Sequence, residues 1–172
     1  MKKFQIRHIG RHNLRAIMSV FIPLAVLSSC TSIDCPFNNT VHSVYSLAGD
    51  MTRLEDTLTI STTRRDGTDS VLINRNTLTE QFSLPMSYQA EEDVLYFEVT
   101  PEGKAATIDT VRVRKEDLPH FESVDCSPAM FHVIKGVETT HHRIDSIVIN
   151  NKNVTYDTSK AHFLIYFKAL DD

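Results

Sequence analysis

Short stretches in which apolar and polar residues alternate recur along the chain, and turn-forming residues separate them. In residues 54–62, for example, Leu58 and Ile60 fall on one face of an extended chain, while threonine and serine fall on the other. No long stretch shows the apolar spacing of an amphipathic helix. The pattern predicts an all-β fold: an antiparallel β-sandwich of immunoglobulin-like type, with a small β-barrel as the alternative.

Turn-forming residues indicate where the expected strands end. Asp66-Gly67 suits a turn that needs positive φ, and residues 101–104 form a second turn. Pro119 and Pro128 are expected to break the chain between strands. Ten short strands result, over residues 41–47, 54–62, 70–74, 78–84, 94–100, 107–114, 121–126, 131–138, 144–150 and 163–168.

The first thirty residues have the organisation of an export signal. Basic residues without any acid precede an apolar run over residues 16–27, which is too short for a bilayer span of about 20 residues. Leu27-Ser28-Ser29-Cys30 then has the form of a lipobox. We therefore expect a signal peptide over residues 1–29, lipidation of Cys30, and one lipid-anchored domain over residues 30–172. The alternative is an ordinary signal peptide cut elsewhere, with Cys30 a plain thiol.

Three cysteines are an odd number for an exported protein, and lipidation of Cys30 resolves the parity. Cys35 and Cys126 are then expected to form a disulfide in an oxidising compartment. The alternative is two buried thiols or metal ligands. The cross-link closes a loop of about 90 residues, for which chain entropy allows roughly 4–5 kcal/mol. Residues 31–34 span at most about 15 Å, so the disulfide would hold the domain close to the membrane.

Charge and motifs exclude several classes of function. Residues 1–29 contain five of the 18 basic residues and no acid, so 13 basic residues remain against 22 acids, a net charge of −9. An acidic domain makes nucleic acid and anionic lipid poor partners. The chain has no Gly-x-Ser-x-Gly motif, no EF-hand spacing and too few glycines for a phosphate-binding loop. We expect neither an enzyme nor a bound cofactor.

Histidine and tyrosine supply the alternative functions. His120, His132 and one of the adjacent pair His141-His142 could form a zinc or copper site, although no His-x-x-x-His or His-Glu-x-x-His motif is present. Structural histidines are the favoured interpretation. Five tyrosines could replace the missing tryptophans as platforms for glycans, but most of them alternate with core residues.

Several segments of the chain resemble a known lipoprotein family. They are the run from Cys30 to Val41, Leu84-Pro85-Met86-Ser87-Tyr88, the run from Pro119 to Cys126, Phe131-His132 and Ile144-Asp145-Ser146-Ile147. Together they are similar to an uncharacterised lipoprotein family of the Bacteroidota, a domain of unknown function. The resemblance implies an envelope location and no particular activity.

The phylum implied by this resemblance suggests a modification. Exported proteins of the Bacteroidota carry O-glycans at Asp-Ser/Thr followed by an aliphatic residue, Thr or Met, and four triplets with an aliphatic third residue resemble this signal. The corresponding acceptors are Thr57, Ser70, Thr110 and Ser146. The alternative is that each aspartate closes a turn before a β-branched strand.

The sequence as a whole predicts a non-enzymatic, lipid-anchored envelope protein. It would be anchored in the outer membrane through lipid on Cys30, and an edge strand or loop would bind another envelope protein or component. Only Asp34 is acidic among residues 31–35, which favours a periplasm-facing position over surface display. The alternative is a periplasmic domain that binds a metal, a small ligand or a glycan.

Overall fold

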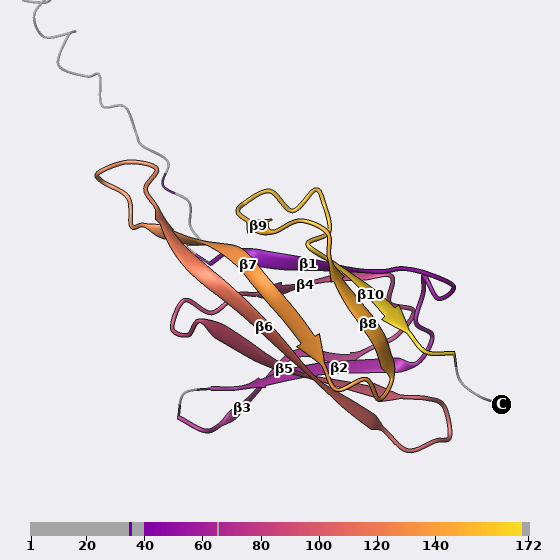
Figure 1. Ribbon diagram of the computed structural model, residues 1–172. Coiled ribbons are helices and arrows are strands. Elements are labelled where there is room, and N and C mark those ends of the chain that lie inside the picture. Colours follow the sequence, from indigo (N-terminus) through magenta and orange to yellow (C-terminus); the bar gives the residue numbers. More distant parts are fainter. Residues whose placement is uncertain (1–34, 36–39, 65, 170–172) are drawn as a thin grey trace, which may run out of the picture. The chain divides into compact units, whose positions relative to one another are not determined.

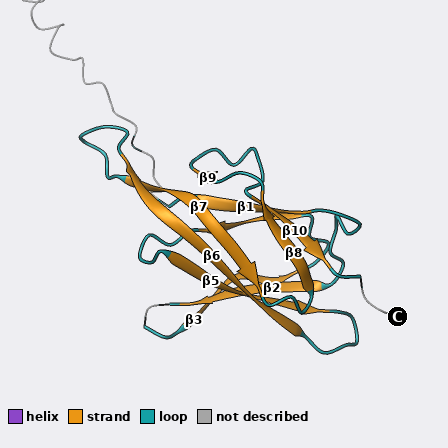
Figure 2. Ribbon diagram, viewed as in Figure 1, coloured by secondary structure: helices purple, strands orange, loops and turns teal. Residues whose placement is uncertain are grey.

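The computed structural model describes residues 35, 40–64 and 66–169, which contain ten strands and no helix (Figures 1 and 2). Four strands form one sheet in the order β4-β1-β10-β8, namely β4 (Gln81–Pro85), β1 (His42–Leu47), β10 (Phe163–Phe167) and β8 (Ile144–Ile149). The other sheet has the order β3-β2-β5-β6-β7-β9, with β3 (Asp69–Asn76), β2 (Thr57–Thr63), β5 (Glu92–Thr100), β6 (Thr107–His120), β7 (Ala129–Thr139) and β9 (Asn153–Val154). The expected signal peptide and Cys30 lie outside the described residues.

The predicted β-sandwich is confirmed. Neighbouring strands are antiparallel except for β1 and β10, which pair in parallel from Tyr45↔Phe163 to Leu47↔Ile165. Within residues 40–64 and 66–169 neither sheet closes into a barrel. The strand order differs from the ABED and CFG sheets of an immunoglobulin constant domain. The immunoglobulin likeness is therefore one of architecture.

The core lies between the two sheets and is richest in aromatic rings near β1. Tyr45 stacks on Phe82 at 5.1 Å and on Phe163 at 4.6 Å, which joins β1 to both of its neighbours. Phe97 of the six-stranded sheet meets Tyr45 at 6.2 Å in a tilted arrangement. All four rings are buried. Aromatic pairs stabilise a fold by more than the burial of their surface alone. This cluster of four rings therefore helps hold the two sheets together.

The two expected turns are present. The amide of Gly67 donates to the carbonyl of Arg64 at 2.9 Å, and Gly67 has φ +80°, a conformation that favours glycine. In the second turn, the amide of Lys104 donates to the carbonyl of Pro101 at 3.2 Å.

Two expectations about the middle of the chain are wrong. Residues 121–126 form a loop and not a strand, and Pro119 does not end β6, because it pairs with Met130 of β7. The pairing of β5 with β6 ends at Arg114. At Pro119, β6 therefore has a paired strand only on the side of β7. Proline is tolerated in such an edge position because no amide is needed there.

Smaller differences concern strand starts. β2 begins at Thr57, and Leu54 makes only an isolated bridge to Thr79. β4 begins at Gln81, and the two-residue β9 was not expected. Among the described residues, no helix has the length and apolar character to cross a membrane.

Candidate functional site

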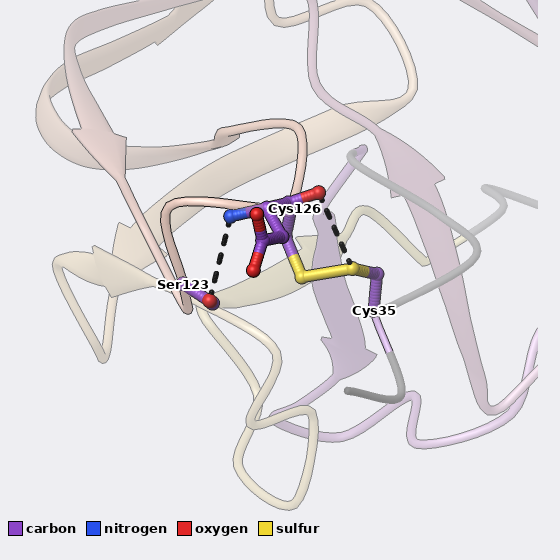
Figure 3. The surroundings of a disulfide bond; sticks show 4 residues. Cys35, Ser123 and Cys126 are labelled. Atoms are coloured by element: carbon purple, nitrogen blue, oxygen red, sulfur yellow. Dashed lines mark hydrogen bonds between the residues drawn. A yellow bond between two sulfur atoms is a disulfide. The ribbon is translucent and has the colours of Figure 1, made fainter. Parts of the chain in front are cut away.

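The Cys35–Cys126 disulfide is present and fastens the loop between β6 and β7 (Figure 3). The two Cα atoms lie 5.4 Å apart. A turn presents Cys126: its amide donates to the carbonyl of Ser123 at 3.2 Å, and the amide of Asp125 donates to Ser123 Oγ at 3.4 Å. Cys126 therefore lies in a loop, whereas the sequence placed it on a strand.

Apolar side chains are exposed around this loop, at the disulfide end of the β6–β7 hairpin. Phe121 is 66% exposed and Val124 is 98% exposed, and Leu118 and Tyr156 are about half as exposed as Val124. We call these four residues the hairpin-end surface. Beside it His120 stacks on Phe131 with ring centroids 4.2 Å apart. The sequence did not reveal this surface, because residues 121–126 were interpreted as a strand of the sandwich.

A second candidate site is a group of charges centred on the buried Lys115, whose two carboxylate partners are partly exposed. Its side chain is completely buried and donates to the carbonyl of Ala90. Its Nζ lies 3.6 Å from a carboxylate oxygen of both Asp93 and Asp117. Asp117 also bonds Nδ1 of the buried His132 at 2.7 Å. We call Lys115, Asp93, Asp117 and His132 the Lys115 cluster.

Burial shifts the pKa of two members of this cluster, Asp93 and His132. Desolvation raises the pKa of Asp93 to about 6, although Lys115 opposes the shift. Desolvation also lowers the pKa of His132, against the pull of Asp117. Asp93 lines an open groove of about 850 Å³, bordered also by Ser87. Perturbed groups beside a groove are typical of functional sites, but buried ion-pair networks produce the same shifts.

Asp109 organises the connection from β7 to β8. Its carboxylate accepts backbone amides of His142 at 2.6 Å, Arg143 at 2.7 Å and Ile144 at 2.8 Å, and the hydroxyl of Thr140 at 2.9 Å. Burial acts to raise its pKa, but these donors outweigh it and the pKa lies below its usual value. A carboxylate bonded in this way has a structural role.

The four Asp-Ser/Thr-aliphatic triplets lie in different surroundings. Thr57 opens β2, and the preceding Asp56 forms an ion pair with Arg143 at 2.9 Å. Thr110 follows Asp109 in β6 and pairs with Tyr96 of β5, and its backbone amide donates to Thr140 Oγ1 at 3.0 Å. The other two acceptors lie on strands at the edges of their sheets, Ser70 on β3 and Ser146 on β8.

The candidate metal-binding histidines are not brought together. His132 is bonded to Asp117 inside the sandwich, and His120 lies in the hairpin end with Nε2 3.0 Å from Glu122. His141 and His142 lie in the connection between β7 and β8, beyond the other end of β7. Over residues 40–64 and 66–169 together with Cys35, no group of three or more His, Cys, Asp or Glu could hold a metal ion.

Comparison with known proteins places the chain in a family. Residues 57–167 match a family model that is described as a family of unknown function (DUF6452). The chain belongs to this family. The DUF6452 match runs from the first residue of β2 to the last residue of β10, so it includes Cys126 but excludes β1 and Cys35. No curated protein and no solved structure matches the chain.

Proposed function

We propose that this chain is a non-enzymatic, lipid-anchored protein of the cell envelope that binds another envelope protein or component through an edge of its β-sandwich. Lipid on Cys30 would anchor it in the outer membrane. The similarity of its early residues to Bacteroidota lipoproteins supports this location. The single acid before Cys35 favours the periplasmic face over surface display.

The observation that carries the proposal is the Cys35–Cys126 disulfide. Disulfides persist in oxidising compartments outside the cytosol. This one pairs two of the three cysteines, and the third is the cysteine that ends the lipobox. Export and acylation of Cys30 thus account for the use of every cysteine in the chain.

The bonding of the buried charges supports a role without catalysis. Asp109 is occupied by backbone amides, Lys115 by a carbonyl and two carboxylates, and His132 by Asp117. Each of these groups has a bonding partner within the fold. Catalytic acids and bases need a free position toward a substrate.

The edge strand β3 is the best placed for strand addition by a partner. It is the longest edge strand in the described residues, with eight residues and a neighbour on one side only. Val71 is 57% exposed there. The β3 edge has features that protect edge strands from non-specific pairing. They are two irregularities in the β2–β3 register and the charges of Asp69 and Arg75. A partner would therefore need a complementary strand.

Acylation is tested by Cys30→Ala in cells supplied with a labelled fatty acid. We expect the variant to remain uncleaved and unlabelled. Cys126→Ser, which removes a cysteine of the disulfide, should still be cleaved and labelled. Acyl label that persists in Cys30→Ala would contradict the anchor.

Partner binding is tested by cross-linking in intact cells, with Val71→Lys compared with Ile108→Lys. Ile108 is 50% exposed on β6, away from the edge, so it is a matched control. The same envelope component should be recovered with the wild type and with Ile108→Lys, and should be lost with Val71→Lys. Equal recovery from both variants would exclude the β3 edge as the contact.

A further inference from the structure

The hairpin-end surface is apolar and solvent-exposed although the sandwich has a well-filled core. Val124 lies in the turn that ends at Cys126, and the residue is 98% exposed. Phe121, at the start of the same loop, is 66% exposed. Two such side chains in one short loop gain no stability from burial in this fold. Exposed apolar side chains that gather on one surface are typical of a contact site.

The disulfide ties this loop to the segment that follows the lipobox. Five residue steps separate Cys30 from Cys35, which is at most about 18 Å for a fully extended chain. Cys126 has its Cα 5.4 Å from that of Cys35. The loop is therefore held within a short reach of the residue that would carry the acyl chains.

We propose that the loop between β6 and β7 docks on the lipid surface in which Cys30 is anchored, with Phe121 and Val124 entering the interfacial region of the bilayer. This inference rests on the proposed acylation of Cys30. Apolar and aromatic side chains beside an existing anchor add buried apolar area at the membrane boundary. Tyr156, exposed next to Phe131, has the amphipathic ring that suits the headgroup level.

The charges around the loop define which lipid it suits. Residues 117–133 contain Asp117, Glu122 and Asp125 but no lysine or arginine. Of the two acids in the loop, Glu122 is bonded to the ring of His120 at 3.0 Å. An acidic loop is repelled by anionic lipid. Docking should therefore be driven by apolar contact, prefer zwitterionic lipid and resist added salt.

The mature acylated protein, residues 30–172, in phosphatidylcholine vesicles provides the test. Because the chain contains no tryptophan, Phe121→Trp and Val124→Trp each introduce a single fluorescent reporter. Ile108→Trp is the matched control, since Ile108 is half-exposed at the opposite end of β6. Vesicle flotation first checks that each variant is anchored. Emission and quenching by lipids brominated on their acyl chains are then measured.

We expect both loop reporters to emit at shorter wavelength on vesicles and to be quenched several-fold more than Ile108→Trp, at low and high salt alike. Anionic vesicles should reduce this difference. If the protein floats but loop and control reporters are quenched equally, the docking proposal is overturned while the anchor stands. If the loop reporters become shielded from aqueous acrylamide without bromolipid quenching, a protein surface covers the loop, which also overturns it. Failure to float would refute the anchor itself.

Discussion

At the scale of single residues, the Lys115 cluster brings two partly exposed carboxylates to one buried cation. His132 adds no charge at neutral pH, because burial lowers its pKa. With Asp93 and Asp117 both ionised, the cluster would carry one excess negative charge. Protonation of Asp93 removes that excess, which agrees with a pKa raised to about 6.

Asp93→Asn should flatten the pH dependence of stability. A raised pKa means that the folded state binds the proton more tightly, so the stability supplied by Asp93 is complete below pH 3.8 and is lost as the pH rises to about 6. The asparagine variant lacks this loss. The unfolding free energies of the wild type and the variant are measured by urea denaturation at several pH values. Their difference should change between pH 3.8 and about 6. Asp66→Asn, at an exposed carboxylate, should show no such change in the same window.

Lys115→Met should destabilise the protein strongly. The substitution leaves two carboxylates in a site without their cation, and breaking a buried pair in this way costs about 3–5 kcal/mol. The loss should be smaller at pH 5, where Asp93 is largely protonated, than at pH 7. Lys135→Met is the control, because Lys135 pairs with Glu116 on the surface and such pairs contribute at most about 1 kcal/mol. Equal losses for the two variants would contradict the role given to Lys115.

At the scale of elements, the disulfide links the loop of the β6–β7 hairpin to Cys35, ahead of β1. The cross-link joins residues 91 positions apart, so its removal enlarges the unfolded ensemble. Reduction should lower the free energy of unfolding by up to about 4–5 kcal/mol in the chain-entropy model. Thermal melts with and without reductant measure this directly. A double variant, Cys35→Ser with Cys126→Ser, should melt at the same temperature in both conditions.

Several strands were predictable from sequence, and the exceptions have physical causes. Residues 94–100 and 163–168 are rich in aromatic and branched apolar residues, and β5 and β10 form there with burial that alternates along each strand. Residues 121–126 were expected to form a strand, but the turn at Ser123 and the disulfide hold them outside both sheets. Pro119 was interpreted as a break because sequence does not show which side of β6 lacks a neighbour.

The candidate sites were less predictable than the strands. The pairing of Cys35 with Cys126 followed from parity and location, and the structure confirms it. The Lys115 cluster was not expected, because its members are separated in sequence and only the registers of β5, β6 and β7 bring them together. Lys115 does lie at an inward position of β6 after Val113, and a lysine at such a position was the signal available.

At the scale of the whole molecule, the two sheets share one core. Phe97 of the six-stranded sheet contacts Tyr45 and Phe82 of the four-stranded sheet. Phe97→Ala should therefore lower the free energy of unfolding by about 3–5 kcal/mol in a single transition. Far-ultraviolet and near-ultraviolet circular dichroism should report the same midpoint. Separate midpoints would show that the sheets unfold independently.

The position of β1 has a consequence for how the protein can be made. This strand is the first along the described chain, yet it lies in the middle of its sheet, and one of its two neighbours is the last strand. During synthesis from the N-terminus, Tyr45 is made long before its partner Phe163. Strand β1 therefore cannot pair with β10 until the chain is almost complete. A fragment of residues 57–167 would lack β1, so β4 and β10 would have no strand between them.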